Sequence, residues 1–185
     1  ALFTAASDAV CQVDGYYKTT GSVIVGSNKF LDVSSADWFY EAVVFAGDNG
    51  LFTGTSETTF SPQNSMTRAM FVTVLHRLAG KPGVTSASAF PDVAAKSLYY
   101  YDAVVWANAK NIVNGYDDGL FKPDQLITRE QMAVIMYRYA SYAGYGAGDV
   151  DTAKYDAFPD AGSVAAFAAD AMKWATANGL INGSD

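Results

Sequence analysis

Apolar residues along this chain recur at steps of three and four, which is the spacing of one buried face of an α-helix. Three such runs share the same order of residue types: Trp38, Ala42, Val43, Phe45 and Ala46; Tyr99, Ala103, Val104, Trp106 and Ala107; and Phe167, Ala171, Met172, Trp174 and Ala175. Each run follows a Phe-x-Asp triplet, at Phe30, Phe90 and Phe158. The pattern therefore predicts a repeated module that opens with an amphipathic helix.

Glycine and asparagine mark where each predicted first helix ends. The runs stop in the segments 49–54, 110–115 and 178–183, which are rich in these two residues. Both residues tolerate the left-handed backbone that ends many helices. Gly54 and Gly115 are expected to have a positive φ.

A second helix is predicted in the first two repeats only. It follows the segments Phe60-Ser61-Pro62 and Phe121-Lys122-Pro123. Thr67 and Thr128 stand where a hydroxyl caps a helix N-terminus, and Gln131 completes a capping box in the second repeat. The module is thus predicted to be a helix, a glycine loop and a helix.

These boundaries divide the chain into four segments. We expect an N-terminal segment over 1–27, modules over 28–85 and 86–146, and a partial module over 147–185. In the N-terminal segment, residues 10–17 and 22–25 carry β-branched and aromatic residues with a Thr-Gly break between them, which indicates a short hairpin. We interpret this segment as the tail of an upstream region. Truncation, or completion by another segment or subunit, would each explain the partial third module.

Composition narrows the classes of function. Half of the residues are hydrophobic, which is enough for a sizeable core, and the aromatic fraction is 14%. A net charge of -7 with 12 scattered Lys and Arg argues against a nucleic-acid partner. No apolar run is long enough for membrane insertion. Since the chain has no initiating methionine, we expect a processed product or a fragment.

The scarcity of cysteine and histidine argues against several kinds of site. Cys11 is the single cysteine and His76 the single histidine. One cysteine cannot form an intrachain disulfide, and the two residues together are too few for a His/Cys metal site or a Ser-His-Asp triad. We therefore expect no metal and no cofactor. We also expect no enzymatic activity, because the repeat places no pair of carboxylates in a way that distinguishes an acid from a base.

The order of motifs in the repeats resembles the S-layer homology family. The shared features are Phe-x-Asp-Val, an aromatic-rich helix, a glycine loop, Phe-x-Pro and Thr-Arg, and they extend from Phe30 to Asp185. The resemblance implies a mainly α fold in which helix-loop-helix modules form a pseudo-threefold bundle. It also implies an extracellular location on the bacterial cell surface, in the cell wall or S-layer. The implied partner is a secondary cell-wall polysaccharide, often carrying a pyruvyl ketal on N-acetylmannosamine.

The resemblance also suggests which residues bind the polysaccharide. The family's Thr-Arg-Ala-Glu motif corresponds to Thr67-Arg68-Ala69-Met70 and Thr128-Arg129-Glu130-Gln131, and both copies depart from it at the fourth place. A guanidinium at the first turn of a helix is well suited to a carboxylate such as a pyruvyl group. The full set of expected carbohydrate-binding residues is Arg68, Arg129, Thr67, Thr128, Glu130, Trp38, Tyr99, Asp32, Asp92, Asp160 and Phe167.

Each of these residues also has a structural interpretation. The arginines could form salt bridges between helices, and the aspartates could cap turns. The aromatic residues at helical spacing could pack in the core, and Trp106 and Trp174 are expected there. A second hypothesis for the whole chain is self-association, as an assembly module of a surface lattice or filament.

Overall fold

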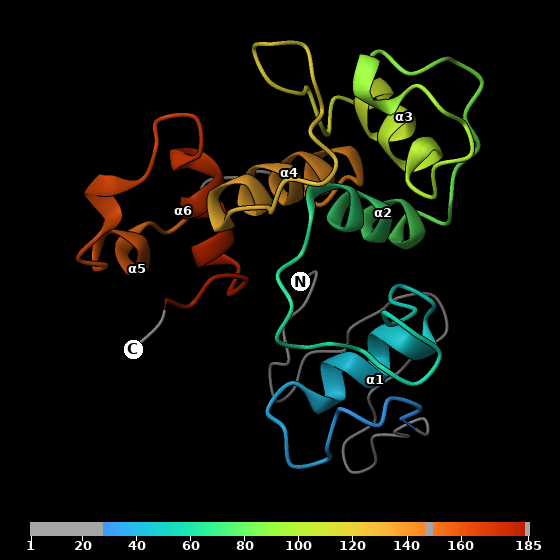
Figure 1. Ribbon diagram of the computed structural model, residues 1–185. Helices are drawn as coiled ribbons and strands as arrows, with labels where there is room; N and C mark the ends of the chain where they lie inside the picture. The colour runs from blue at the N-terminus through green and yellow to red at the C-terminus, as the bar shows by residue number, and fades with distance from the viewer. Residues whose placement is uncertain (1–27, 147–149, 184–185) are drawn as a thin grey trace. The chain divides into compact units, whose positions relative to one another are not determined.

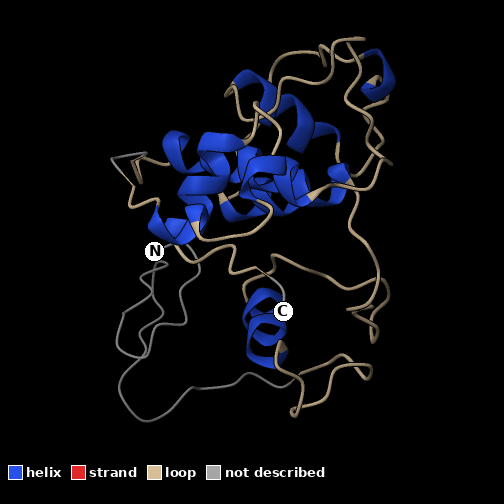
Figure 2. Ribbon diagram, turned by 90° about the vertical axis from the view of Figure 1, so that its left-hand side faces the viewer, coloured by secondary structure: helices blue, strands red, loops and turns tan. Residues whose placement is uncertain are grey.

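The computed structural model describes residues 28–146 and 150–183, and these residues are mainly helical. Figure 2 shows helices joined by long loops, and the described part contains no strand. The mainly α class predicted from the sequence is therefore confirmed. The hairpin expected before residue 28 lies outside the described residues.

The helices follow the predicted repeats. Each repeat has a first helix: α1 (Tyr40–Asp48), α3 (Tyr101–Ala109) and α6 (Ala169–Ala177). The first two have a second helix: α2 (Arg68–Leu78) and α4 (Arg129–Tyr142). Three short elements complete the set: η1 (Pro91–Val93), α5 (Ala153–Asp156) and η2 (Ala161–Ser163).

The helix ends have the chemistry that the sequence predicts. The hydroxyls of Thr67 and Thr128 accept backbone N–H groups three residues later, at 3.3 and 3.2 Å. Gly50, Asn111 and Gly179 stand two residues after the last residue of the three first helices, and all have positive φ. Because a left-handed residue turns the chain away from the helix axis, these positions end the helices.

The chain divides into two compact lobes between Ile127 and Thr128. Among the described residues, we call 28–127 the first lobe and 128–146 with 150–183 the second lobe. In the first lobe α2 packs against α3, and in the second α4 packs against α6 (Figure 1). In both lobes the second helix of one repeat thus packs against the first helix of the next.

Each lobe has its own apolar core. In the first lobe the most deeply buried side chains include Val72 and Leu75 of α2, Val104 of α3, and Phe121. In the second lobe small residues of α4 and α6, together with Trp174, let these two helices approach closely. Trp106 and Trp174 are both buried, as the sequence predicts.

The region around α1 has a smaller core. Phe30, Val33 and Val43 are buried together, and Phe60 packs against them. The Nη1 atom of Arg77, on α2, donates to the carbonyl of Leu51 at 2.9 Å. The start of the first repeat and its Phe-x-Pro segment are thus held together around one helix.

Candidate functional site

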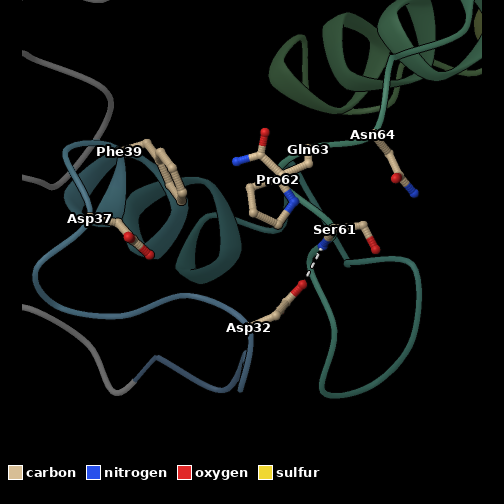
Figure 3. Close-up of a pocket in the computed structure, with 7 residues that line it drawn as sticks. All are labelled: Asp32, Asp37, Phe39, Ser61, Pro62, Gln63 and Asn64. Carbon is tan, nitrogen blue, oxygen red and sulfur yellow. Dashed lines mark hydrogen bonds between the residues drawn. The ribbon is translucent and has the colours of Figure 1, made fainter.

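Two aspartates hold the Phe-x-Pro segments in place. The carboxylate of Asp32 accepts the N–H groups of Phe60 and Ser61 at 2.8 and 2.7 Å. Figure 3 shows the contact with Ser61. The carboxylate of Asp92 accepts the N–H groups of Phe121 and Lys122 at 3.0 and 2.7 Å. The N–H of Phe60 is the main reason why the pKa of Asp32 lies below its ordinary value. Each bidentate contact joins the start of a repeat to a loop 28 to 30 residues later.

These contacts fix an unusual backbone conformation. Ser61 and Lys122 both have positive φ, at 63° and 59°. Residues other than glycine adopt this region rarely, so the aspartate contacts offset a local strain. Asp32 and Asp92, expected to bind sugar, therefore have a structural role that the turn-capping alternative partly anticipated.

A shallow pocket of about 370 Å³ lies beside Asp32. Figure 3 shows Asp37, Phe39, Pro62, Gln63 and Asn64 around it. Its wall carries carboxylates, an amide pair and an aromatic ring, which are groups that can contact a sugar. The pocket belongs to the first lobe.

One exposed aromatic residue precedes the first helix of every repeat. Trp38, Tyr99 and Phe167 are 94%, 65% and 63% exposed. The sequence placed them on the buried stripe of the helix, and that placement is wrong because the helices begin two residues later. Trp38 and Tyr99 make edge contacts with the next aromatic residue, Phe39 and Tyr100. Their remaining faces are available to a ligand.

The two candidate arginines lie in different surroundings. Arg68 is 5% exposed, and its Nε donates to the carbonyl of Phe121 at 3.0 Å. Its guanidinium also lies over the rings of Tyr116 and Phe121, 4.7 and 5.0 Å from their centroids. Burial lowers the pKa of Arg68 from its ordinary value. This side chain therefore contributes to the structure of the first lobe.

Arg129 is exposed and lines a pocket of about 350 Å³ in the second lobe. Asp160 lines the same pocket, so the structure brings together two of the expected site residues, Arg129 and Asp160, beside Phe158. Arg129 is thus an accessible cation at the first turn of α4.

The other polar candidates are bound to backbone. Thr67 and Thr128 cap α2 and α4, and the Oε1 atom of Glu130 accepts the N–H of Ala165 at 2.8 Å. Glu130 thereby joins α4 to the loop before α6 in the second lobe. These contacts give all three residues a structural role.

Sequence reasoning missed the role of Tyr116. Its ring faces both the Arg68 guanidinium and the Nζ atom of Lys122. Tyr116 follows the glycine loop of the second repeat directly, and the first repeat has Thr55 at that place. The sequence signal that could have indicated this role is the different residue that the two repeats have at this position.

The chain belongs to the S-layer homology family. The family model for the S-layer homology domain matches residues 29–70, 89–133 and 157–185, which together make up more than half of the chain. One matched segment lies in each of the two complete repeats and one in the partial third. The family resemblance inferred from the motifs is confirmed.

Several curated proteins are similar to this chain. An endoglucanase of Bacillus sp. (strain KSM-635) is 32% identical over 155 residues, which cover 84% of this chain and 16% of that protein. Cell surface glycoprotein 1 of Acetivibrio thermocellus is 31% identical over a match that covers 60% of this chain and 5% of that protein. The surface-layer 125 kDa protein of Lysinibacillus sphaericus is 29% identical over a match that covers 61% of this chain and 10% of that protein. The chain thus spans a small part of these relatives.

The family and its surface-protein relatives confirm the extracellular, cell-surface location expected from the sequence. Among residues 28–146 and 150–183, no helix has the length and apolar character needed to cross a membrane.

Proposed function

We propose that this chain is a non-catalytic anchoring module that binds a secondary cell-wall polysaccharide, most specifically a pyruvylated polymer containing N-acetylmannosamine. The observation that carries the proposal is the exposed aromatic residue before the first helix of every repeat. Aromatic faces bury the apolar side of a sugar ring while its hydroxyls stay hydrated. Three such faces suit a polymer better than a single small molecule.

Arg129 supplies the positive charge that a pyruvyl carboxylate requires. It is exposed at the start of α4, where the helix dipole also favours anions. Arg68 has the same place in the first repeat, but it is buried against Phe121. We therefore assign anion binding to Arg129 and assign Arg68 a structural role.

The anchoring role also agrees with the relatives. Two of them are surface proteins by name, and the endoglucanase matches this chain over 16% of its length. A short module shared by surface proteins and an enzyme is more consistent with attachment than with catalysis. The polymer and the role of the whole protein are part of this proposal.

Co-sedimentation with purified wall polymer tests the proposal. The intact protein should pellet with the polymer, and Arg129→Ala or chemical removal of pyruvyl groups should abolish this. Trp38→Ala should weaken binding about tenfold, since one stacked ring is worth roughly 0.5–1.5 kcal/mol beyond its burial. Tyr145→Ala and Lys96→Ala are matched controls, because both residues are exposed and precede no first helix directly. The proposal would be disproved if the Arg129 variant still pelleted with the polymer and the parent protein still pelleted with polymer that lacks pyruvyl groups.

A further inference from the structure

The chain contains four Asn-Gly pairs, which stand at two kinds of position in the repeats. Asn49-Gly50 and Asn178-Gly179 directly follow the first helices α1 and α6. Asn114-Gly115 and Asn182-Gly183 stand at the end of the glycine loops. Asparagine before glycine is prone to lose its side-chain amide, because glycine has no Cβ to shield the backbone nitrogen that attacks it. The structure distinguishes the four pairs by how freely this nitrogen can meet the amide.

The two pairs that follow helices are held at both reacting groups. The Nδ2 atom of Asn49 donates to the carbonyl of Phe45 at 2.8 Å, and that of Asn178 donates to the carbonyl of Trp174 at 2.9 Å. The N–H of the following glycine also donates to a helix carbonyl, at 3.0 Å in both cases. Both hydrogen bonds must break before the glycine nitrogen can reach the side-chain carbon, so the folded state protects these pairs.

The pair Asn114-Gly115 has neither of these restraints. Asn114 is exposed, and within residues 28–146 and 150–183 neither its side chain nor the N–H of Gly115 makes a hydrogen bond. The residues on either side are fixed, because the N–H groups of Val113 and Tyr116 donate to backbone carbonyls at 3.2 and 2.9 Å. Two residues with free reacting groups thus lie between two anchored ones.

Asn182 is restrained at its amide. Its Oδ1 atom accepts from the Nζ of Lys154 at 2.7 Å, and its Nδ2 atom donates to the carbonyl of Gly179 at 3.2 Å. The first repeat has Thr53 at the corresponding place, which carries no amide. Of the four pairs, Asn114-Gly115 is therefore the one with both reacting groups unrestrained in the described part of the chain.

We propose that Asn114 is a site of spontaneous modification, at which the side-chain amide leaves as ammonia and the main chain acquires an isoaspartate. The nitrogen of Gly115 gives its proton to solvent hydroxide and attacks the Cγ atom of Asn114. The N–Cγ bond forms, the Cγ–Nδ2 bond breaks, and Nδ2 takes a proton from water as it leaves. Water then opens the cyclic imide at either carbonyl carbon, which gives isoaspartate or aspartate.

The isoaspartate product disturbs a closely packed part of the first lobe. Its side-chain Cβ becomes part of the main chain, so the chain is one atom longer between residues 114 and 115. Gly115 has little room to move, since a Cβ there would lie 2.5 Å from the Phe90 ring and 2.9 Å from the Leu120 carbonyl oxygen. Phe90 is itself buried and packs on Phe121, with ring centroids 5.7 Å apart. The modification therefore destabilises the loop around these rings.

Peptide mapping by mass spectrometry tests the proposal on the folded 185-residue protein, incubated at mildly alkaline pH. Asn114 should convert about tenfold faster than Asn49 and Asn178, because two hydrogen bonds must break before either of these can react. Asn182 should fall between the two groups. The same incubation in denaturant is the control, and there all four pairs should convert at similar rates because the restraints are gone.

Variants connect the modification to stability. Asn114→Gln keeps an amide at an exposed position, but its longer side chain must close a larger ring and reacts more slowly. After incubation, the parent protein should have a Tm about 5 °C below that of Asn114→Gln treated in the same way. Asn182→Gln is the matched control, since it retains Asn114 and should lose stability as the parent does.

Three outcomes would overturn the proposal. The first is equal conversion of Asn49, Asn114 and Asn178 in the folded protein. The second is an Asn114 that converts in denaturant but stays intact in the folded protein. The third is an equal Tm for the incubated parent and the incubated Asn114→Gln variant. These experiments contain no polysaccharide, so their failure would leave the anchoring function untouched.

Discussion

At the scale of single residues, equivalent positions of the repeats have diverged in their surroundings. Arg68 and Arg129 follow capping threonines, yet one is buried and the other exposed. The difference arises because the loop of the next repeat, with Tyr116 and Phe121, covers Arg68. The arginine of the shared Thr-Arg pair thus stabilises the fold in one lobe and faces solvent in the other.

Arg68→Ala should destabilise the first lobe by about 2 kcal/mol, because it leaves the carbonyl of Phe121 without its charged donor. The same change should leave polymer sedimentation unchanged for protein that remains folded. Urea unfolding followed by tryptophan fluorescence measures the first effect. Arg129→Ala is the matched control, and it should affect stability by less than about 0.5 kcal/mol because Arg129 is exposed. Loss of polymer binding with full stability in Arg68→Ala would contradict the structural role.

At the scale of elements, the glycine loops determine how each first helix meets the start of its own repeat. Gly115 has a φ of +74°, and a Cβ there would come within 2.5 Å of the Phe90 ring and 2.9 Å of the Leu120 carbonyl oxygen. Gly54 has the same relation to Phe30. The loop therefore requires glycine for two reasons, backbone conformation and close packing.

Gly115→Ala should destabilise the protein by about 3 kcal/mol, since overpacking adds to the cost of positive φ. Gly119→Ala is the control that isolates the backbone term, because Gly119 has a φ of +76° with nothing within 4 Å of its Cβ position. It should cost about 1 kcal/mol. Thermal unfolding of the two variants gives the difference. Equal losses would show that the contact with Phe90 contributes nothing.

The elements were more predictable than the site. Helical spacing, threonine caps and glycine stops are local signals, and they predict the first and second helices of the repeats and the loops at which the first helices stop. The burial of Arg68 depends on a loop more than 50 residues away, which no local pattern contains. The exposure of Trp38, Tyr99 and Phe167 depends on a helix start two residues later than the apolar pattern indicates. Long-range contacts and small shifts of a boundary therefore account for what the sequence could not predict.

At the scale of the molecule, the sequence repeat and the packing unit are different. Each lobe combines the second helix of one repeat with the first helix of the next. A module cut at the repeat boundary would separate α2 from α3 and expose the apolar faces of both. This offset also explains why the pocket beside Phe158 and Asp160 of the third repeat is lined by Arg129, a residue of the second repeat.

Asp32 should contribute to the response of stability to acid. Its folded-state pKa is lowered, chiefly by the N–H of Phe60, so its contribution is present above the unfolded pKa of about 3.9 and is lost as the pH falls through the folded value. Asp32→Asn should therefore remove part of the acid sensitivity of the protein below about pH 4. Urea midpoints measured between neutral pH and acid test this, with Asp48→Asn, an exposed position on α1, as control. Parallel pH profiles for Asp32→Asn and the parent would contradict the assignment.

Tyr139 of the second lobe should contribute to the response of stability to alkali. Burial is the main cause that raises the pKa of Tyr139 to about 12, so the folded state holds its proton where the unfolded state, with a pKa near 10, releases it. Stability should be fully present below about pH 10 and decline as the pH rises toward 12. Tyr139→Phe keeps the ring and removes the titrating group, so this variant should lose less stability between those values. Tyr137→Phe, on the same helix, retains Tyr139 and should follow the parent. If the Tyr139→Phe curve also coincides with the parent in thermal unfolding across that range, this side chain does not cause the alkaline loss.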